Sequence, residues 1–75
     1  MRKITARQAE VLITISNFIE KNGIPPTYRE LMKELNLSST ASVKSLLDRL
    51  KQKNYITWQE GLPRTLKITE RAYQI

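Results

Sequence analysis

Residues 35–54, LNLSSTASVKSLLDRLKQKN, combine a short polar turn with a strongly amphipathic helical pattern. Four apolar residues recur at helical spacing and fall on one stripe, namely Val43, Leu46, Leu47 and Leu50. The opposite face is small and polar with basic flanks, and consists of Ala41, Ser42, Lys44, Ser45, Asp48, Arg49 and Gln52. A helix with such a thin, hydrogen-bonding edge fits the DNA major groove, where base edges present donors and acceptors. We therefore predict a recognition helix over residues 40–53, capped by Ser39.

A capping box marks the first helix of the chain. Thr5 can cap a helix start, and Gln8, three residues later, completes the reciprocal pair. The apolar periodicity then continues over residues 6–22 and stops at Gly23, a residue suited to a left-handed C-terminal position. The stripe that we expect to pack into the core is Val11, Leu12, Ile15, Phe18 and Ile19.

A second capping box comes after an extended linker. Residues 24–26, Ile-Pro-Pro, cannot continue a helix because proline fixes φ and restricts the residue before it. Thr27 and Glu30 then predict a helix over residues 28–35. The connection of about four residues between this helix and the one at 40–53 has the length of a helix-turn-helix turn.

The chain after Asn54 has the alternating pattern of a β-hairpin. Residues 55–59 and 64–68 each alternate apolar and polar side chains, and a turn containing Gly61 and Pro63 separates them. The expected inward positions are Ile56, Trp58, Leu66 and Ile68. We predict a mainly α fold with a small β-hairpin, a winged helix-turn-helix of three helices and a two-stranded antiparallel wing. Residues 1–75 are expected to form one domain.

Composition and charge indicate which kind of partner this chain binds. The 75 residues carry a net charge of +6, with neither cysteine nor histidine, so disulfides and thiolate or imidazole metal sites are excluded. Residues 36–68 hold six Lys and Arg against two acids, whereas residues 1–35 hold six against four. A polyanionic partner near the predicted recognition helix is the expectation, with no metal, no cofactor and no membrane segment. The cysteine-free composition favours a cytoplasmic location.

Several segments together resemble a known family. They are Thr5-Ala6-Arg7-Gln8, Glu10-Val11, Gly23-Ile24-Pro25-Pro26-Thr27, Glu30 and the leucine pattern as far as Leu50. This combination resembles the N-terminal DNA-binding domain of LexA repressors, without a gap from Thr5 to about Trp58 and, through the wing, to Ile68. The resemblance implies a bacterial or phage transcriptional repressor of the SOS-response type that binds operator DNA. LexA proteins continue into a dimerising domain that cuts its own chain with a serine–lysine dyad, and we expect neither part within these 75 residues.

The resemblance also implies which residues bind DNA. Base or phosphate contacts are expected from the start of the third helix, at Ser39, Ala41, Ser42, Lys44 and Ser45. Backbone contacts are expected from Lys53 and Arg64. Secondary phosphate contacts are expected from Thr27, Arg29 and Arg7, at the starts of the first two helices. The operator sequence does not carry over, because Lys44 and Ser45 stand where some relatives have acidic residues.

Two other classes of function compete with this hypothesis. Winged helices also serve as protein-docking surfaces, and such a module would show no preference between DNA sequences. An enzyme is the weaker alternative, because without His or Cys the chemistry would fall on Ser/Lys or paired carboxylates. The adjacent Lys44 and Ser45 point in different directions on an exposed helix, where nothing desolvates the lysine. For the DNA-binding hypothesis we expect a monomer in solution that pairs on a two-half-site operator, because one winged helix makes a small interface.

Overall fold

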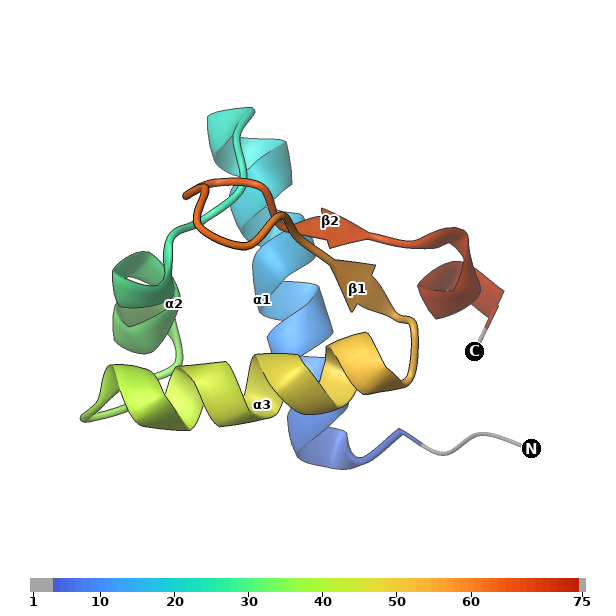
Figure 1. Cartoon of the computed structure of the whole chain (residues 1–75), viewed down its shortest axis with the longest axis horizontal. Helices are drawn as coiled ribbons and strands as arrows, with labels where there is room; N and C mark the ends of the chain where they lie inside the picture. The colour runs from blue at the N-terminus through green and yellow to red at the C-terminus, as the bar shows by residue number, and fades with distance from the viewer. Residues whose placement is uncertain (1–3, 75) are drawn as a thin grey trace.

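Three helices, a short hairpin and a terminal turn make up the computed structural model, which describes residues 4–74. In chain order the elements are α1 (Ala6–Asn22), α2 (Tyr28–Glu34), α3 (Thr40–Gln52), β1 (Ile56–Thr57), β2 (Lys67–Ile68) and the 3-10 helix η1 (Glu70–Gln74). In Figure 1, α1 runs through the middle of the molecule, α3 crosses its N-terminal half, and the hairpin lies above α3. This architecture confirms the predicted fold class, a mainly helical winged helix-turn-helix.

Both predicted capping boxes are present. At the start of α1, the Gln8 amide donates to Thr5 Oγ1 and the Thr5 amide donates to Gln8 Oε1, each at 3.1 Å. At the start of α2, the Glu30 amide donates to Thr27 Oγ1 at 3.2 Å and the Thr27 amide donates to Glu30 Oε1 at 2.9 Å. Each box satisfies two amides that a helix start otherwise leaves unpaired. These local bonds define where the two helices begin.

Residues in the left-handed region lie at the ends of all three α-helices. Gly23 has φ 76°, and its amide donates to the Ile19 carbonyl at 2.7 Å, which closes α1. Asn36 (φ 56°) and Asn54 (φ 66°) adopt the same region after α2 and α3. Asparagine tolerates this conformation better than most residues do, so the chain can turn sharply at the end of each of these two helices.

One hydrophobic core joins all the elements. Its buried members are Val11, Leu12, Ile15, Leu31, Leu35, Val43, Leu47, Leu50, Tyr55, Ile56 and Leu66. The apolar stripes of the three helices therefore face one another, as the periodicity predicted. Phe18 departs from that prediction, because it is only partly buried and does not belong to the residues packed on this cluster. The stripe of α3 points into the core, which leaves the opposite face of that helix exposed.

The wing strands are shorter than the sequence suggested. Instead of residues 55–59 and 64–68, each strand has two residues, paired antiparallel in the register Ile56↔Ile68 and Thr57↔Lys67. Positive φ angles at Gly61 (81°) and Arg64 (59°) take the chain out of extended geometry between them. A side chain replaces the ladder there: the Gln59 amide donates to Thr65 Oγ1 at 2.9 Å. Residues 58–66 therefore form a long loop rather than the upper part of a hairpin ladder.

The C-terminal turn covers a residue that simple alternation would place outside. Tyr55 is only 3% exposed, as deeply buried as its neighbour Ile56. The Thr69 amide donates to the Tyr55 carbonyl at 2.9 Å, and the Arg71 guanidinium lies 5.7 Å from the centre of the Tyr55 ring. The segment from residue 70, which had no predicted element, forms η1 as far as Gln74, and Ile75 lies outside the described residues.

Candidate nucleic-acid interface

The start of α3 is exposed and rich in hydrogen-bonding groups. Ser39 caps the helix as predicted: its Oγ accepts from the Ser42 amide at 3.3 Å and lies 3.1 Å from Ser42 Oγ. The neighbouring predicted contacts Ala41, Lys44 and Ser45 are also exposed. Unpaired amides and the helix dipole favour an anion at such a terminus. Small side chains there leave room for a close approach to a flat or grooved surface.

The outer face of α3 forms one shallow surface. It is lined by Ala41, Lys44, Ser45, Asp48, Arg49 and Gln52. Lys44 Nζ lies 3.7 Å from an Asp48 carboxylate oxygen, one turn further along the helix. Both side chains are about half exposed, so this pair is weak and screened by salt. The structure therefore brings three of the predicted contacts, Ala41, Lys44 and Ser45, onto one surface together with Asp48, whereas Ser39 and Ser42 do not line it.

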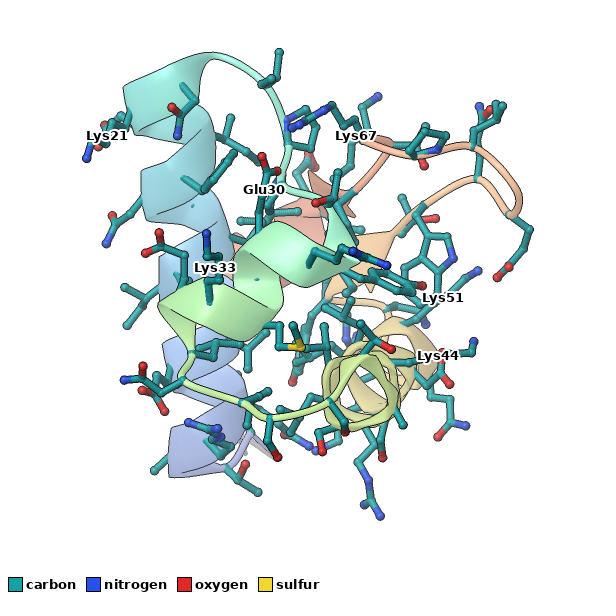
Figure 2. The ribbon with its side chains drawn as sticks, turned by 90° about the vertical axis from the view of Figure 1, so that its left-hand side faces the viewer. Lys21, Glu30, Lys33, Lys44, Lys51 and Lys67 are labelled. Carbon is teal, nitrogen blue, oxygen red and sulfur yellow. The ribbon has the colours of Figure 1, made fainter. Side chains whose placement is uncertain are left out.

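Labelled lysines lie on both sides of the molecule in the view of Figure 2. Lys44 and Lys51 project from α3 on the side toward which the wing extends, whereas Lys21 and Lys33 lie on the other side (Figure 2). The Lys51 ammonium lies 4.2 Å from the centre of the Trp58 ring and 3.5 Å from a Glu60 carboxylate oxygen. Two lysines, each beside a carboxylate, therefore lie where α3 and the wing meet.

A partly open cleft of about 440 Å³ separates the wing from the helices. Its walls come from the start of α2, from Lys44 on α3 and from the loop 58–66. Burial raises the pKa of the Tyr28 hydroxyl in this wall, although the nearby Lys44 charge acts in the opposite direction. Tyr28 therefore remains a neutral hydroxyl that can donate a hydrogen bond at neutral pH.

The Trp58 cluster, consisting of Lys51, Trp58 and Glu60, ties the outgoing arm of the loop to α3. Trp58 Nε1 donates to Glu60 Oε2 at 2.9 Å, and Lys51 approaches both residues. The indole is partly buried against the core, as the sequence pattern predicted. Lys51 and Glu60 were not singled out as part of an interface, because the helix and the wing meet only in the folded chain.

Arg64 is engaged within the protein. Its two terminal nitrogens donate to the two Glu30 carboxylate oxygens at 2.9 and 3.0 Å, and Nη1 also donates to the Pro25 carbonyl at 3.1 Å. Hydrogen bonds from Arg64 and then from the Thr27 amide lower the pKa of the Glu30 carboxyl. The sequence placed Arg64 on an exposed hairpin tip, and no local pattern indicated Glu30, 34 positions earlier, as its partner.

Lys53 is also engaged. Its ammonium donates to Gln8 Oε1 at 3.0 Å, which joins the end of α3 to the start of α1. Gln8 is 5% exposed and already belongs to the first capping box. The sequence identified Gln8 as a capping residue but contained no signal for this second partner.

The three secondary candidates lie at the starts of α1 and α2. Arg29 is exposed on the first turn of α2 and forms no ion pair or hydrogen bond within residues 4–74, whereas Thr27 is occupied in its capping box. Arg7 pairs with Glu10 on α1 at 2.6 Å. Thr27 lines the cleft and Arg29 does not, whereas the contacts of Arg7 remain on its own helix.

Helices α2 and α3 form a helix-turn-helix, and the hairpin of β1 and β2 follows them. An exposed second helix with such a hairpin after it defines the winged helix-turn-helix class. The sequence model of the LexA DNA binding domain matches residues 1–65. The chain therefore belongs to the LexA DNA-binding domain family.

Its curated relatives include the LexA repressors of Citrifermentans bemidjiense (39% identical over 72 residues) and Thermotoga maritima (39% over 70 residues). The Transcription regulator LexA of a Synechocystis species is 35% identical over 68 residues. These matches cover 96%, 93% and 91% of this chain, but 36%, 35% and 34% of the relatives. The chain thus spans about a third of the length of these relatives.

Among residues 4–74 no helix is long and apolar enough to cross a membrane. In the same part of the chain no group of acidic, histidine or cysteine side chains could hold a metal ion.

Proposed function

We propose that this domain binds double-stranded DNA in a sequence-specific manner and acts as the DNA-reading part of a transcriptional repressor. The observation that carries the proposal is the outer face of α3, which is exposed, small at its start and flanked by the basic residues Lys44 and Arg49. A helix of this kind can enter the major groove while the wing lies along the sugar–phosphate backbone. The names of the relatives, LexA repressor and Transcription regulator LexA, agree with this role.

The residues divide into those that read bases and those that set position. Ser39, Ala41, Ser42, Lys44 and Ser45 are proposed to contact bases or the phosphates beside them. Ala41 suits a thymine methyl, and the serine hydroxyls can donate or accept. Lys53, Thr27, Arg29 and Arg7 are proposed as candidates for the phosphate backbone, whereas the guanidinium of Arg64 is bound to Glu30. Of these, Arg29 needs no rearrangement, because no described residue occupies its guanidinium.

Pairing of two copies on DNA completes the proposal. A single winged helix has a small interface with DNA, so tight and specific binding is expected from two copies on adjacent half-sites. We propose a monomer in free solution and no catalytic activity for these residues. The bacterial cytoplasm, where the chromosome lies, is the corresponding location.

Selection from a randomised duplex library tests the proposal. The selected duplex and a scrambled control would be compared by fluorescence anisotropy at about 0.15 M salt, where unspecific charge attraction is screened. We expect a palindromic site, bound about a hundredfold more tightly than the control. If about five phosphates are contacted, the log–log salt slope should be about −4 to −5. Equal, weak and salt-sensitive binding to both duplexes would contradict the proposal and direct attention to a protein partner.

A further inference from the structure

The wing has little backbone structure to hold it in place. Its ladder consists of two residues on each side, and a two-stranded hairpin of this size is unstable by itself. The tip is exposed, with Leu62 55% exposed, and the hydrogen bonds of Thr65 to Gln59 and Leu62 stay within the loop. The position of the loop must therefore depend on side chains, namely Trp58 and Leu66, which pack on the core, and polar links to the helices.

Two polar links are present in addition, one from each arm of the loop. The outgoing arm reaches α3 through the Trp58 cluster. The returning arm reaches the start of α2 through Arg64, which binds Glu30 with two hydrogen bonds and the Pro25 carbonyl with a third. The two arms are thus attached to the two helices of the helix-turn-helix.

The geometry at Glu30 makes its link stronger than a typical surface ion pair. Most exposed pairs contribute little, because two long side chains must be immobilised in one geometry. Here the Thr27 amide already binds Glu30 Oε1 at 2.9 Å, so the carboxylate is oriented before Arg64 arrives. The arginine fork then matches the two oxygens with parallel hydrogen bonds.

The same geometry weakens Arg64 as a phosphate ligand. Three of its five N–H donors are used, and a full negative charge lies 2.9 Å away. A phosphate that approached Arg64 would meet a nearly neutral pair rather than a free cation.

We propose that Arg64 is a positioning residue whose pair with Glu30, the Arg64–Glu30 brace, holds the wing against the start of α2 before DNA binds. The brace sets the wing beside α3, so that the loop meets the backbone while the helix occupies the groove. The effect on DNA affinity rests on the proposed function, whereas the effect on the wing of the free protein does not.

Glu30→Gln and Arg64→Lys are the variants that test the brace. Gln8 shows that glutamine can complete a capping box in this protein, so Glu30→Gln removes the charge of the brace and retains the helix cap. Arg64→Lys keeps the positive charge and removes the fork. Glu34→Gln is the matched control on α2 for both measurements, and Arg29→Lys is a control for the free protein only, because neither side chain has a hydrogen bond or ion pair within the described part of the chain.

The first measurement uses the free protein. Backbone ¹⁵N relaxation should show that the order parameters of residues 59–65 fall from about 0.85 to about 0.6 in both brace variants, while the helices and both controls remain unchanged. Unchanged order in the wing would overturn the proposal, whether or not the protein binds DNA. A loss of order throughout the molecule would also overturn it, because the pair would then be a general stabiliser of the fold.

The second measurement is the affinity for the selected duplex. If the Arg64–Glu30 pair acts as a brace, each single variant should bind the selected duplex about threefold to fivefold more weakly than the wild type does. The double variant should bind no more weakly than either single variant. If Arg64 instead bound a phosphate directly, Glu30→Gln would tighten binding by releasing the guanidinium, and Arg64→Lys would change it little. Tighter binding of the duplex by Glu30→Gln would therefore overturn the brace. Failure of the wild type to prefer any sequence would overturn the proposed function, and the relaxation data would still decide the brace.

Discussion

The two capping boxes are the same local motif in two different environments. In each, a threonine caps the helix and the residue three positions later bonds back to it. In each, that later residue also accepts a hydrogen bond from a distant cationic side chain: Gln8 from Lys53 and Glu30 from Arg64. The Gln8 box joins α1 to α3, whereas the Glu30 box joins α2 to the wing.

Burial explains the choice of side chain at each box. Gln8 is 5% exposed, and a carboxylate at such a depth would lose its hydration, so a neutral amide accepts the hydrogen bond instead. The side chain of Glu30 is 35% exposed and remains hydrated enough to stay ionised, which gives the arginine fork a charged partner. The buried box should therefore matter most for stability, and the exposed box for the position of the wing.

The largest expected effect on stability comes from Gln8→Ala. The change removes the return bond of the cap and leaves Lys53 without this acceptor in a partly buried site. We expect the free energy of unfolding to fall by about 2 kcal/mol, measured by urea denaturation. Asn17→Ala, on the exposed face of α1, is the control and should change it by less than about 0.5 kcal/mol. A loss for Gln8→Ala no larger than that for Asn17→Ala would contradict the stabilising role of the buried box.

We expect Lys53→Met to lower stability less than Gln8→Ala does, and to affect DNA binding as well. Methionine keeps the apolar stem and loses the donor to Gln8, so unfolding should become easier by about 1 kcal/mol. If Lys53 also contacts a phosphate, affinity should fall alike for the selected and scrambled duplexes, with a salt slope about one unit shallower. A loss confined to the selected duplex would instead make Lys53 a specificity residue.

Acidification should weaken the Glu30 box and change the structure only near it. Because hydrogen bonds from Arg64 lower the pKa of Glu30 in the folded protein, the brace contributes fully above the ordinary glutamate pKa. That contribution is lost as pH falls through the lowered pKa, when the carboxyl takes up a proton and releases the fork. Amide chemical shifts of residues 59–65 should follow this titration, and the step should be missing in Glu30→Gln. A step that persists in the variant would assign the titration to another carboxyl.

Lys44→Ala should have the smallest effect on stability. Lys44 is exposed and has only a weak partner in Asp48, so unfolding should change by less than about 0.5 kcal/mol. Its effect should appear in repeated duplex selection, as a change in the preferred sequence. Uniform weakening on all sequences would reassign Lys44 to the phosphate backbone.

The helices of this domain were predictable from sequence, because their signals are local. Capping boxes extend over four residues and an apolar stripe recurs every turn, so the starts of the helices and the outward face of α3 can be derived from short segments. The predicted contacts on α3 share one exposed face because the buried stripe determines which side remains outside. The sequence predicted the position of the wing correctly but overestimated the length of its strands. The alternation of apolar and polar residues does not reveal the positive φ angles at Gly61 and Arg64.

The sequence by itself determined three helices with their caps and the exposed face of α3, and its motifs resemble those of the family. Tertiary structure decided the partners of Lys53 and Arg64, which lie 45 and 34 positions away along the chain. It also decided the burial of Tyr55 beneath the C-terminal turn. The physical reason is range: helix signals act between neighbours in sequence, whereas a long cationic side chain binds whichever acceptor the folded core brings within about 3 Å.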